Sequence, residues 1–294
     1  MRSRLFILLS IAIVLVSCGR KPAESKVMAR EVPERADDFV FENNLIAGRI
    51  YGKALEGNPT SPGVDICVKL PGALVADTWY AEALKDGGYY HRDHGGKDCY
   101  KVGVSLGGGA SVPFIDGRLC YPPTNYRSSE ILEYTPVKVV FVLHYPAWEA
   151  AEGITVSLDK KITVCADSYF CDVEDTYSFT GAETIPVAAG IKLHGEQKTI
   201  QDKYIAEDRL AIWEQASDQS VEPEDGMIGV AVIMPEATEV YLYEDLDHGL
   251  LTQEIRSGEP FRYRFGSCWS KGDIKTPEAW FALVGKVTLA QLIQ

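Results

Sequence analysis

The feature that most constrains the fold is a series of short segments in which apolar and polar residues alternate. Residues 137–145 show it best, because their odd positions form one apolar face and β-branched residues are frequent. Clusters of glycine, proline, aspartate and asparagine separate these segments. The other expected strands are residues 45–51, 65–70, 101–106, 154–158, 161–166, 173–179, 187–194, 210–213, 227–234, 239–243 and 261–265. Because no series of helices alternates with these strands, the pattern predicts an all-β fold, a large antiparallel β-sandwich.

Two helices are expected beside the strands. Asp77 or Thr78 can cap a short helix that ends before Gly87. Thr276 followed by Pro277 predicts the start of a second helix near the C-terminus. Its apolar residues recur at helical spacing, so this helix should pack on the sheets.

The N-terminus has the features of a bacterial lipoprotein signal peptide. Arg2 and Arg4 precede an apolar stretch, residues 5–16, that is short for a bilayer span, and Cys18 follows closely. We therefore expect residues 1–17 to be cleaved and Cys18 to carry lipid, which would hold the protein in the cell envelope, outside the cytoplasm. A transmembrane anchor is the alternative.

The composition of the remaining chain indicates one domain behind a tether. Residues 18–34 are polar and rich in Lys, Glu, Ala and Pro, which is typical of a flexible tether, and residues 35–294 are expected to form a single β-sandwich domain. The formal net charge of -13 argues against nucleic acid as a partner and leaves the lipid anchor as the link to a membrane. The seven cysteines form no C-x-x-C pair, so most should be small buried residues, with one or two disulfides as an alternative.

Residues 89–103 combine more reactive side chains than any other stretch. Two of the five histidines lie there with aspartates, tyrosines and basic residues around a double glycine. Loops held on a rigid sheet commonly carry catalytic groups, and histidine transfers protons near neutral pH. We interpret this stretch as the edge of an active or binding site, with hydrogen-bonded loop residues of no catalytic role as the alternative.

This stretch could support two kinds of sugar cleavage. Elimination beside a uronate carboxylate needs a base, an acid and a cation. The candidates, in that order, are His91 or His94, Tyr90 or Tyr100, and Arg92 or Lys101. Hydrolysis would instead use Asp93 and Asp98 as a carboxylate pair. A divalent metal is a third alternative, but the spacing matches neither a zinc protease nor a calcium loop, so no cofactor is predicted.

Other candidates for substrate binding lie outside this stretch. Arg49 and Tyr51 share one face of an expected strand, where Arg49 could bind a carboxylate. His194 ends another strand and could point into the same site. Trp269 is a candidate platform for a sugar ring, with Lys271 beside it. An ordinary solvated or buried position is the alternative for each.

Four segments together resemble a bacterial family called domain of unknown function 4861. They are residues 35–52, 90–109, 186–191 and 262–271. The resemblance implies a secreted or lipid-anchored protein of Gram-negative polysaccharide degraders, facing the periplasm or the cell surface. It also implies the β supersandwich fold of galactose-mutarotase-like proteins and several polysaccharide lyases. The family's genes are often linked or fused to those of enzymes that remove unsaturated uronic acids.

The functional hypothesis is a lipid-anchored, carbohydrate-active protein. It would act on uronic-acid-containing oligosaccharides or polysaccharides, by elimination or hydrolysis, with His91 and His94 as proton carriers. A glycan-binding lipoprotein without catalysis is one alternative, and a sugar epimerase is another.

Overall fold

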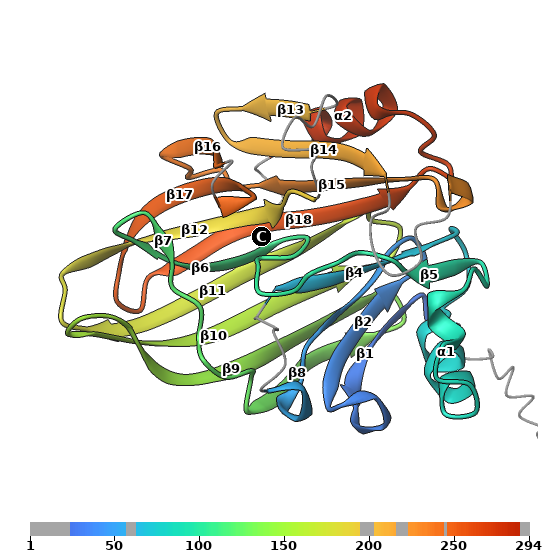
Figure 1. Cartoon of the computed structure of the whole chain (residues 1–294), viewed down its shortest axis with the longest axis horizontal. Coiled ribbons are helices and arrows are strands. Elements are labelled where there is room, and N and C mark those ends of the chain that lie inside the picture. The colour runs from blue at the N-terminus through green and yellow to red at the C-terminus, as the bar shows by residue number, and fades with distance from the viewer. Residues whose placement is uncertain (1–23, 57–62, 195–202, 216–222, 244–245, 289–294) are drawn as a thin grey trace, which may run out of the picture.

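The computed structural model describes residues 24–56, 63–194, 203–215, 223–243 and 246–288. Their strands form three sheets, and all the pairings between neighbouring strands within them are antiparallel (Figure 1). The N-terminal sheet has the order β1-β2-β3-β4-β5. It consists of β1 (Val27–Val32), β2 (Asp38–Asn43), β3 (Ala47–Ile50), β4 (Val64–Lys69) and β5 (Gly96–Asp98).

The large sheet has eight strands in the order β13-β14-β15-β18-β11-β10-β9-β8. They are β8 (Ser128–Thr135), β9 (Lys138–Ala151), β10 (Ile154–Cys165), β11 (Phe170–Thr180), β13 (Lys203–Ala206), β14 (Arg209–Gln215), β15 (Met227–Ile233) and β18 (Pro260–Trp269). The third sheet has the order β16-β17-β12-β6-β7. It contains β6 (Ala110–Ile115), β7 (Arg118–Leu119), β12 (Thr184–Lys192), β16 (Glu239–Tyr243) and β17 (His248–Arg256).

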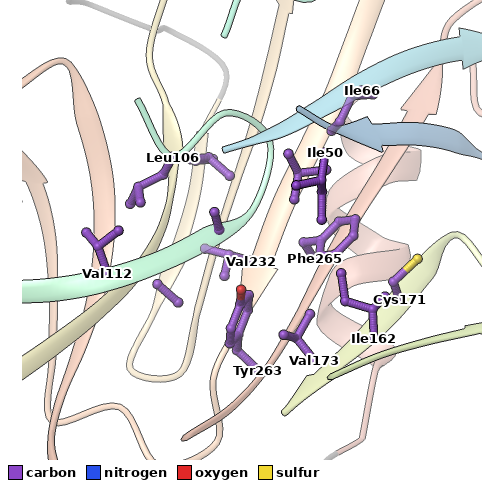
Figure 2. Close-up of a cluster of buried hydrophobic side chains, with 14 of the residues drawn as sticks. Ile50, Ile66, Leu106, Val112, Ile162, Cys171, Val173, Val232, Tyr263 and Phe265 are labelled. Atoms are coloured by element: carbon purple, nitrogen blue, oxygen red, sulfur yellow. The ribbon is translucent and has the colours of Figure 1, made fainter. Parts of the chain in front are cut away.

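The main core lies where the large sheet packs against both smaller sheets. Phe39 of the N-terminal sheet lies against Phe141 of the large sheet, with ring centroids 4.4 Å apart. Figure 2 shows side chains of the same core, among them Ile50 from β3, Val112 from β6 and Phe265 from β18. The predicted antiparallel, all-β sandwich is therefore confirmed.

The helices cover the outer faces of the sandwich (Figure 1). The predicted C-terminal helix is confirmed as α2 (Pro277–Lys286): the Thr276 side chain accepts a hydrogen bond from Ala279 N, and Trp280 packs on the large sheet. Helix α1 (Ala76–Ala83) covers the N-terminal sheet, but neither Asp77 nor Thr78 caps it. The carboxylate of Glu42, from β2, accepts hydrogen bonds from the backbone N–H groups of Val75 and Ala76 instead.

Three expectations about the backbone need correction. The expected tether, residues 18–34, includes β1, whose buried residues and pairing with β2 make it part of the sheet. Residues 154–158 and 161–166 belong to one strand, β10. The expected strand at residues 101–106 is a loop, in which Gly103 adopts a left-handed φ of 59°.

The structure does not test the expected signal-peptide cleavage or lipidation, but it does describe the other six cysteines. Cys18 and the expected signal peptide lie outside the described residues, so lipidation stays a prediction from the sequence. Within the described part of the chain, Cys67, Cys99, Cys120, Cys165, Cys171 and Cys268 are not paired in disulfides with one another. None of the helices in that part has the length and apolar character needed to span a bilayer.

His248 on β17 provides a test of how burial affects stability. Its Nδ1 lies against the Leu246 carbonyl and its Nε2 accepts a hydrogen bond from Leu106 N, which fixes a neutral tautomer. Burial lowers the pKa of His248 to about 4. The unfolded chain, with an ordinary histidine pKa of about 6.5, therefore binds the proton more tightly.

We expect His248 to stabilise the fold fully above pH ~6.5 and progressively less as the pH falls towards ~4. The unfolding free energy that is lost over this pH range through His248 should be on the order of 3 kcal/mol. Urea unfolding of the wild type and of His248→Gln at several pH values would measure it, since the other titrating groups are common to both proteins. A stability difference that does not shrink on acidification would contradict this assignment.

Candidate functional site

The charged residues closest to the predicted site lie on the outer face of the N-terminal sheet. Side chains alternate between faces along a strand, and the register places Arg49 opposite Asp65. Asp38, Arg49, Asp65 and Asp98 therefore lie on the face covered by α1 and by the 3-10 helix η3 (Tyr89–His91), while the alternate residues enter the main core. These charges are inside the protein but outside the sandwich core.

Arg49 is the centre of a buried ionic network. Its Nη2 lies 2.7 Å from Asp65 Oδ2 and 2.8 Å from Asp98 Oδ2, and its Nε lies 3.7 Å from Asp38 Oδ2. The Tyr51 hydroxyl donates to Asp65 Oδ2 over 2.9 Å. Arg49 is only 4% exposed. A buried guanidinium thus holds together carboxylates from three other strands.

The network contains more carboxylates than its cation can pair with at close range. Asp38 Oδ2, Asp65 Oδ1 and Arg49 Nη1 are buried without a hydrogen-bond partner among the described residues. Burial raises the pKa of Asp65 to about 7, although Arg49 opposes this shift, and repulsion from Asp98 adds to it. Burial also raises the pKa of Asp38. Near neutral pH the network is therefore poised to bind a proton.

Tyr90 and His91 of η3 lie directly over this network. Their ring centroids are 4.5 Å apart, and His91 Nδ1 lies 3.9 Å from Asp98 Oδ2. The His91 side chain is 28% exposed. The Tyr90 oxygen accepts a hydrogen bond from Arg35 Nε over 2.8 Å. Because Arg35 uses only the oxygen lone pair, the Tyr90 hydroxyl keeps its proton for another acceptor.

Glu42 and Lys69 form a second buried ion pair on the same face. Lys69 Nζ donates to Glu42 Oε1, to Asn43 O and to Ala73 O, at 2.7, 2.8 and 2.7 Å. Glu42 also holds the start of α1. This pair connects the ends of β2 and β4 to α1. All three N–H groups of the Lys69 ammonium have acceptors within the protein, so the role of the pair is structural.

The other predicted residues of the 89–103 stretch are at the surface. His94 is exposed and stacks on Tyr89, with centroids 3.9 Å apart. Asp93 pairs with Lys271 at 2.7 Å, and Arg92 pairs with Asp86. Asp93 and Asp98 therefore have different partners and different burial, unlike the matched pair that hydrolysis was expected to use.

Arg49 and Tyr51 both contact Asp65, but Tyr51 lies beyond the end of β3 with its ring in the main core, and the face that carries Arg49 is covered. The guanidinium of Arg49 already binds two carboxylates, and the Tyr51 hydroxyl is bound to Asp65. Neither is available for substrate, which corrects their expected role. The expected strand is present as β3, but no local sequence pattern indicates that α1 and η3 cover the face that carries Arg49.

Tyr100 and His194 are in ring contact with each other, apart from the Arg49 network. The buried Tyr100 hydroxyl donates to Gly107 O and Lys192 O, over 3.2 and 3.4 Å. His194 Nδ1 lies 2.6 Å from Glu214 Oε1, and its Nε2 lies 2.7 Å from the Lys101 carbonyl. With these contacts both residues hold the fold together, and the Lys101 side chain is exposed. The expected roles of Tyr100 in proton donation and of His194 in substrate binding are thus corrected.

Trp269 is also structural. It is 2% exposed, and its indole N–H donates to Asp225 O over 2.7 Å. Lys271 Nζ lies 4.9 Å from the centroid of its ring. A sugar cannot stack on a ring that is already covered, so the expected platform is wrong.

Sequence analysis missed three residues that shape the site: Arg35, Asp38 and Asp65. A signal for two of them exists, because strand alternation places Asp38 on one face with Glu42 and Asp65 on one face with Lys69, in strands that are otherwise apolar. Charged residues at such positions indicate a buried ionic network. For the residues that the structure describes, no group of three or more His, Cys, Asp or Glu side chains is arranged to hold a metal ion.

The fold and site define an all-β protein with a covered ionic network beneath a partly exposed histidine. The chain belongs to the family described as domain of unknown function (DUF4861), whose model matches residues 18–290. The uncharacterized protein P7 of Formosa agariphila is 30% identical over 267 residues, in an alignment that covers 86% of this chain and 64% of that protein. The chain thus spans about two thirds, at most, of the length of this curated relative.

Two solved structures also align with the chain. A galactose mutarotase related enzyme from Lactobacillus acidophilus aligns over 79% of this chain and 97% of its own, with 11% identity and a TM-score of 0.32. Heparinase III aligns over 86% of this chain and 37% of its own, with 9% identity and a TM-score of 0.34.

Proposed function

We propose that this protein cleaves oligosaccharides containing uronic acid by elimination, with His91 as the base and Tyr90 as the acid. The observation that carries the proposal is the position of these two side chains. They are adjacent on η3, His91 is partly exposed, and the Tyr90 hydroxyl proton has no acceptor within the described residues.

The chemistry assigns a task to each group. His91 takes the proton from the ring carbon next to the carboxylate, and the electron pair of that C–H bond forms a double bond to the neighbouring ring carbon. The bond from that carbon to the leaving oxygen breaks, and Tyr90 donates its proton to that oxygen. Solvent then returns the proton from His91 to Tyr90. The Asp98 carboxylate lies beside the base, with its Oδ2 3.9 Å from His91 Nδ1.

His91→Ala is expected to reduce turnover about 10²–10⁴-fold, the usual contribution of a general base. His144→Ala is the matched control, because His144 also pairs with a carboxylate, Asp159, but lies on an exposed part of β9. The assay follows the ultraviolet absorbance of the new double bond on short oligosaccharides of galacturonate, glucuronate and mannuronate.

Each other result has a definite meaning. Unchanged turnover in folded His91→Ala would contradict the assignment of the base. Cleavage without ultraviolet absorbance would identify hydrolysis, and sugar binding without cleavage would identify a glycan-binding protein. Both would overturn the proposal of elimination.

A further inference from the structure

We propose that Arg35 recognises the carboxylate of the sugar and makes this site selective for uronic acids over neutral sugars. This inference rests on the proposed function, since it assigns the specificity of the same site. It concerns a residue of the short 3-10 helix η1 (Pro33–Arg35), which lies far from η3 in sequence and meets it in space.

The guanidinium of Arg35 is held in place without being used up. Nε donates to the Tyr90 oxygen, and Nη1 lies 3.8 Å from Asp38 Oδ2. Within the described residues, Nη2 has no hydrogen-bond acceptor, and the side chain is 26% exposed. Arg49, by contrast, is buried and bound to two carboxylates. Arg35 is therefore the cation beside Tyr90 whose remaining N–H groups a ligand can reach, because the unpaired Nη1 of Arg49 is buried.

The backbone that presents Arg35 is strained. Ala36 and Asp37, which follow it, both have left-handed φ angles, 56° and 57°. Side chains with a Cβ rarely adopt this conformation, and two in succession persist only where the surroundings enforce them. Such strain is concentrated at functional sites.

The surroundings of this turn do enforce it. The Tyr126 hydroxyl donates to Asp37 O over 2.6 Å, and Gly52 N donates to Asp38 Oδ1 over 2.9 Å. A Cβ on Gly52 would lie 1.8 Å from Asp37 O, so only glycine permits this close approach. The turn thus fixes the end of η1, and with it the position of Arg35 relative to Tyr90.

A guanidinium at this position suits the chemistry of elimination. Its planar N–H groups match the two oxygens of a carboxylate. Neutralising that carboxylate makes the neighbouring C–H bond easier to deprotonate, because the negative charge that develops in the transition state is stabilised. Since Arg35 contacts the Tyr90 oxygen, one residue would hold the carboxylate and orient the acid.

The test compares each galacturonate, glucuronate and mannuronate oligosaccharide with its methyl ester, which removes the charge and adds only a methyl group. Arg35→Met is expected to lower kcat/KM about tenfold to a hundredfold on the free acids and less than about twofold on the esters. Arg35→Lys, which keeps the charge, should recover part of the loss. Arg30→Met is the matched control, because Arg30 pairs with Glu34 and Asp77 on the same side of the protein.

An equal loss on acids and esters, or no loss on the acids, would overturn the inference. If the wild type proves not to cleave any of these sugars, calorimetric binding still decides the question. The wild type and His91→Ala should then bind the acids more tightly than the esters, and Arg35→Met should lose that preference. Binding without preference would overturn the role of Arg35, whereas binding with preference but without cleavage would overturn only the proposed reaction.

Discussion

Arg49→Met is expected to cost about 3–5 kcal/mol of folding free energy, a large part of the ~5–15 kcal/mol that typically stabilises a folded domain. The substitution keeps an unbranched apolar stem but removes the cation that faces Asp38, Asp65 and Asp98. Buried carboxylates without a partner are either ionised at a high cost or protonated. Urea unfolding followed by circular dichroism would measure the loss.

The pH dependence of this variant separates lost charge from lost packing. Without Arg49 the folded carboxylates bind protons more tightly than the unfolded chain does, so the destabilisation should shrink as the pH falls towards ~4. Adding Asp65→Asn should recover part of the stability for the same reason. Arg127→Met, which breaks a partly exposed pair with Glu56, should cost no more than about 1 kcal/mol. A loss that small for Arg49→Met would contradict the central role of the network.

The alternation of apolar and polar side chains made the sandwich predictable. The strands that were predicted wrongly, β10 and β1, are those in which this alternation is broken or weak. The clear pattern of residues 137–145 became the start of β9 because nothing interrupts it. In β10 the inward position after Leu158 is taken by Lys160, and the pattern therefore indicated two strands where there is one. β1 was missed because polar residues surround it in the expected tether, although Val27, Met28, Ala29 and Val32 are apolar and buried and the strand pairs with β2.

How far the candidate site could be predicted differs from residue to residue. The density of reactive groups drew attention to Tyr90 and His91, whose rings the structure places 4.5 Å apart. Contacts between distant segments decide the rest: Arg35 meets Tyr90 across 55 positions of sequence, and Trp269 is covered by its neighbours. Local patterns contain no information about such pairings, because burial of a side chain depends on which segment packs over it.

Lys160 and Asp175 form a buried ion pair inside the sandwich core, and we expect it to contribute as much to stability as the Arg49 network. Both are fully buried, and Lys160 Nζ lies 2.6 Å from Asp175 Oδ2 and 3.2 Å from the Tyr263 hydroxyl. Ser111, from the third sheet, also donates to the Asp175 carboxylate. Burial raises the pKa of Asp175, while Lys160 opposes that shift. The pair therefore links β10 and β11 of the large sheet to β6 across the core.

Lys160→Met is expected to cost about 3–5 kcal/mol, because it leaves the Asp175 charge buried without its cation. Lys161→Met is a close control: it is the next residue on the same strand, points to the outer face, and pairs with the partly exposed Glu174, so its loss should stay near or below about 1 kcal/mol. Replacing both members, as in Lys160→Met with Asp175→Asn, should cost less than the sum of the single changes, since neither charge is then left alone. Equal effects of the two lysine substitutions in chemical unfolding would show that burial of Lys160 adds nothing to its importance.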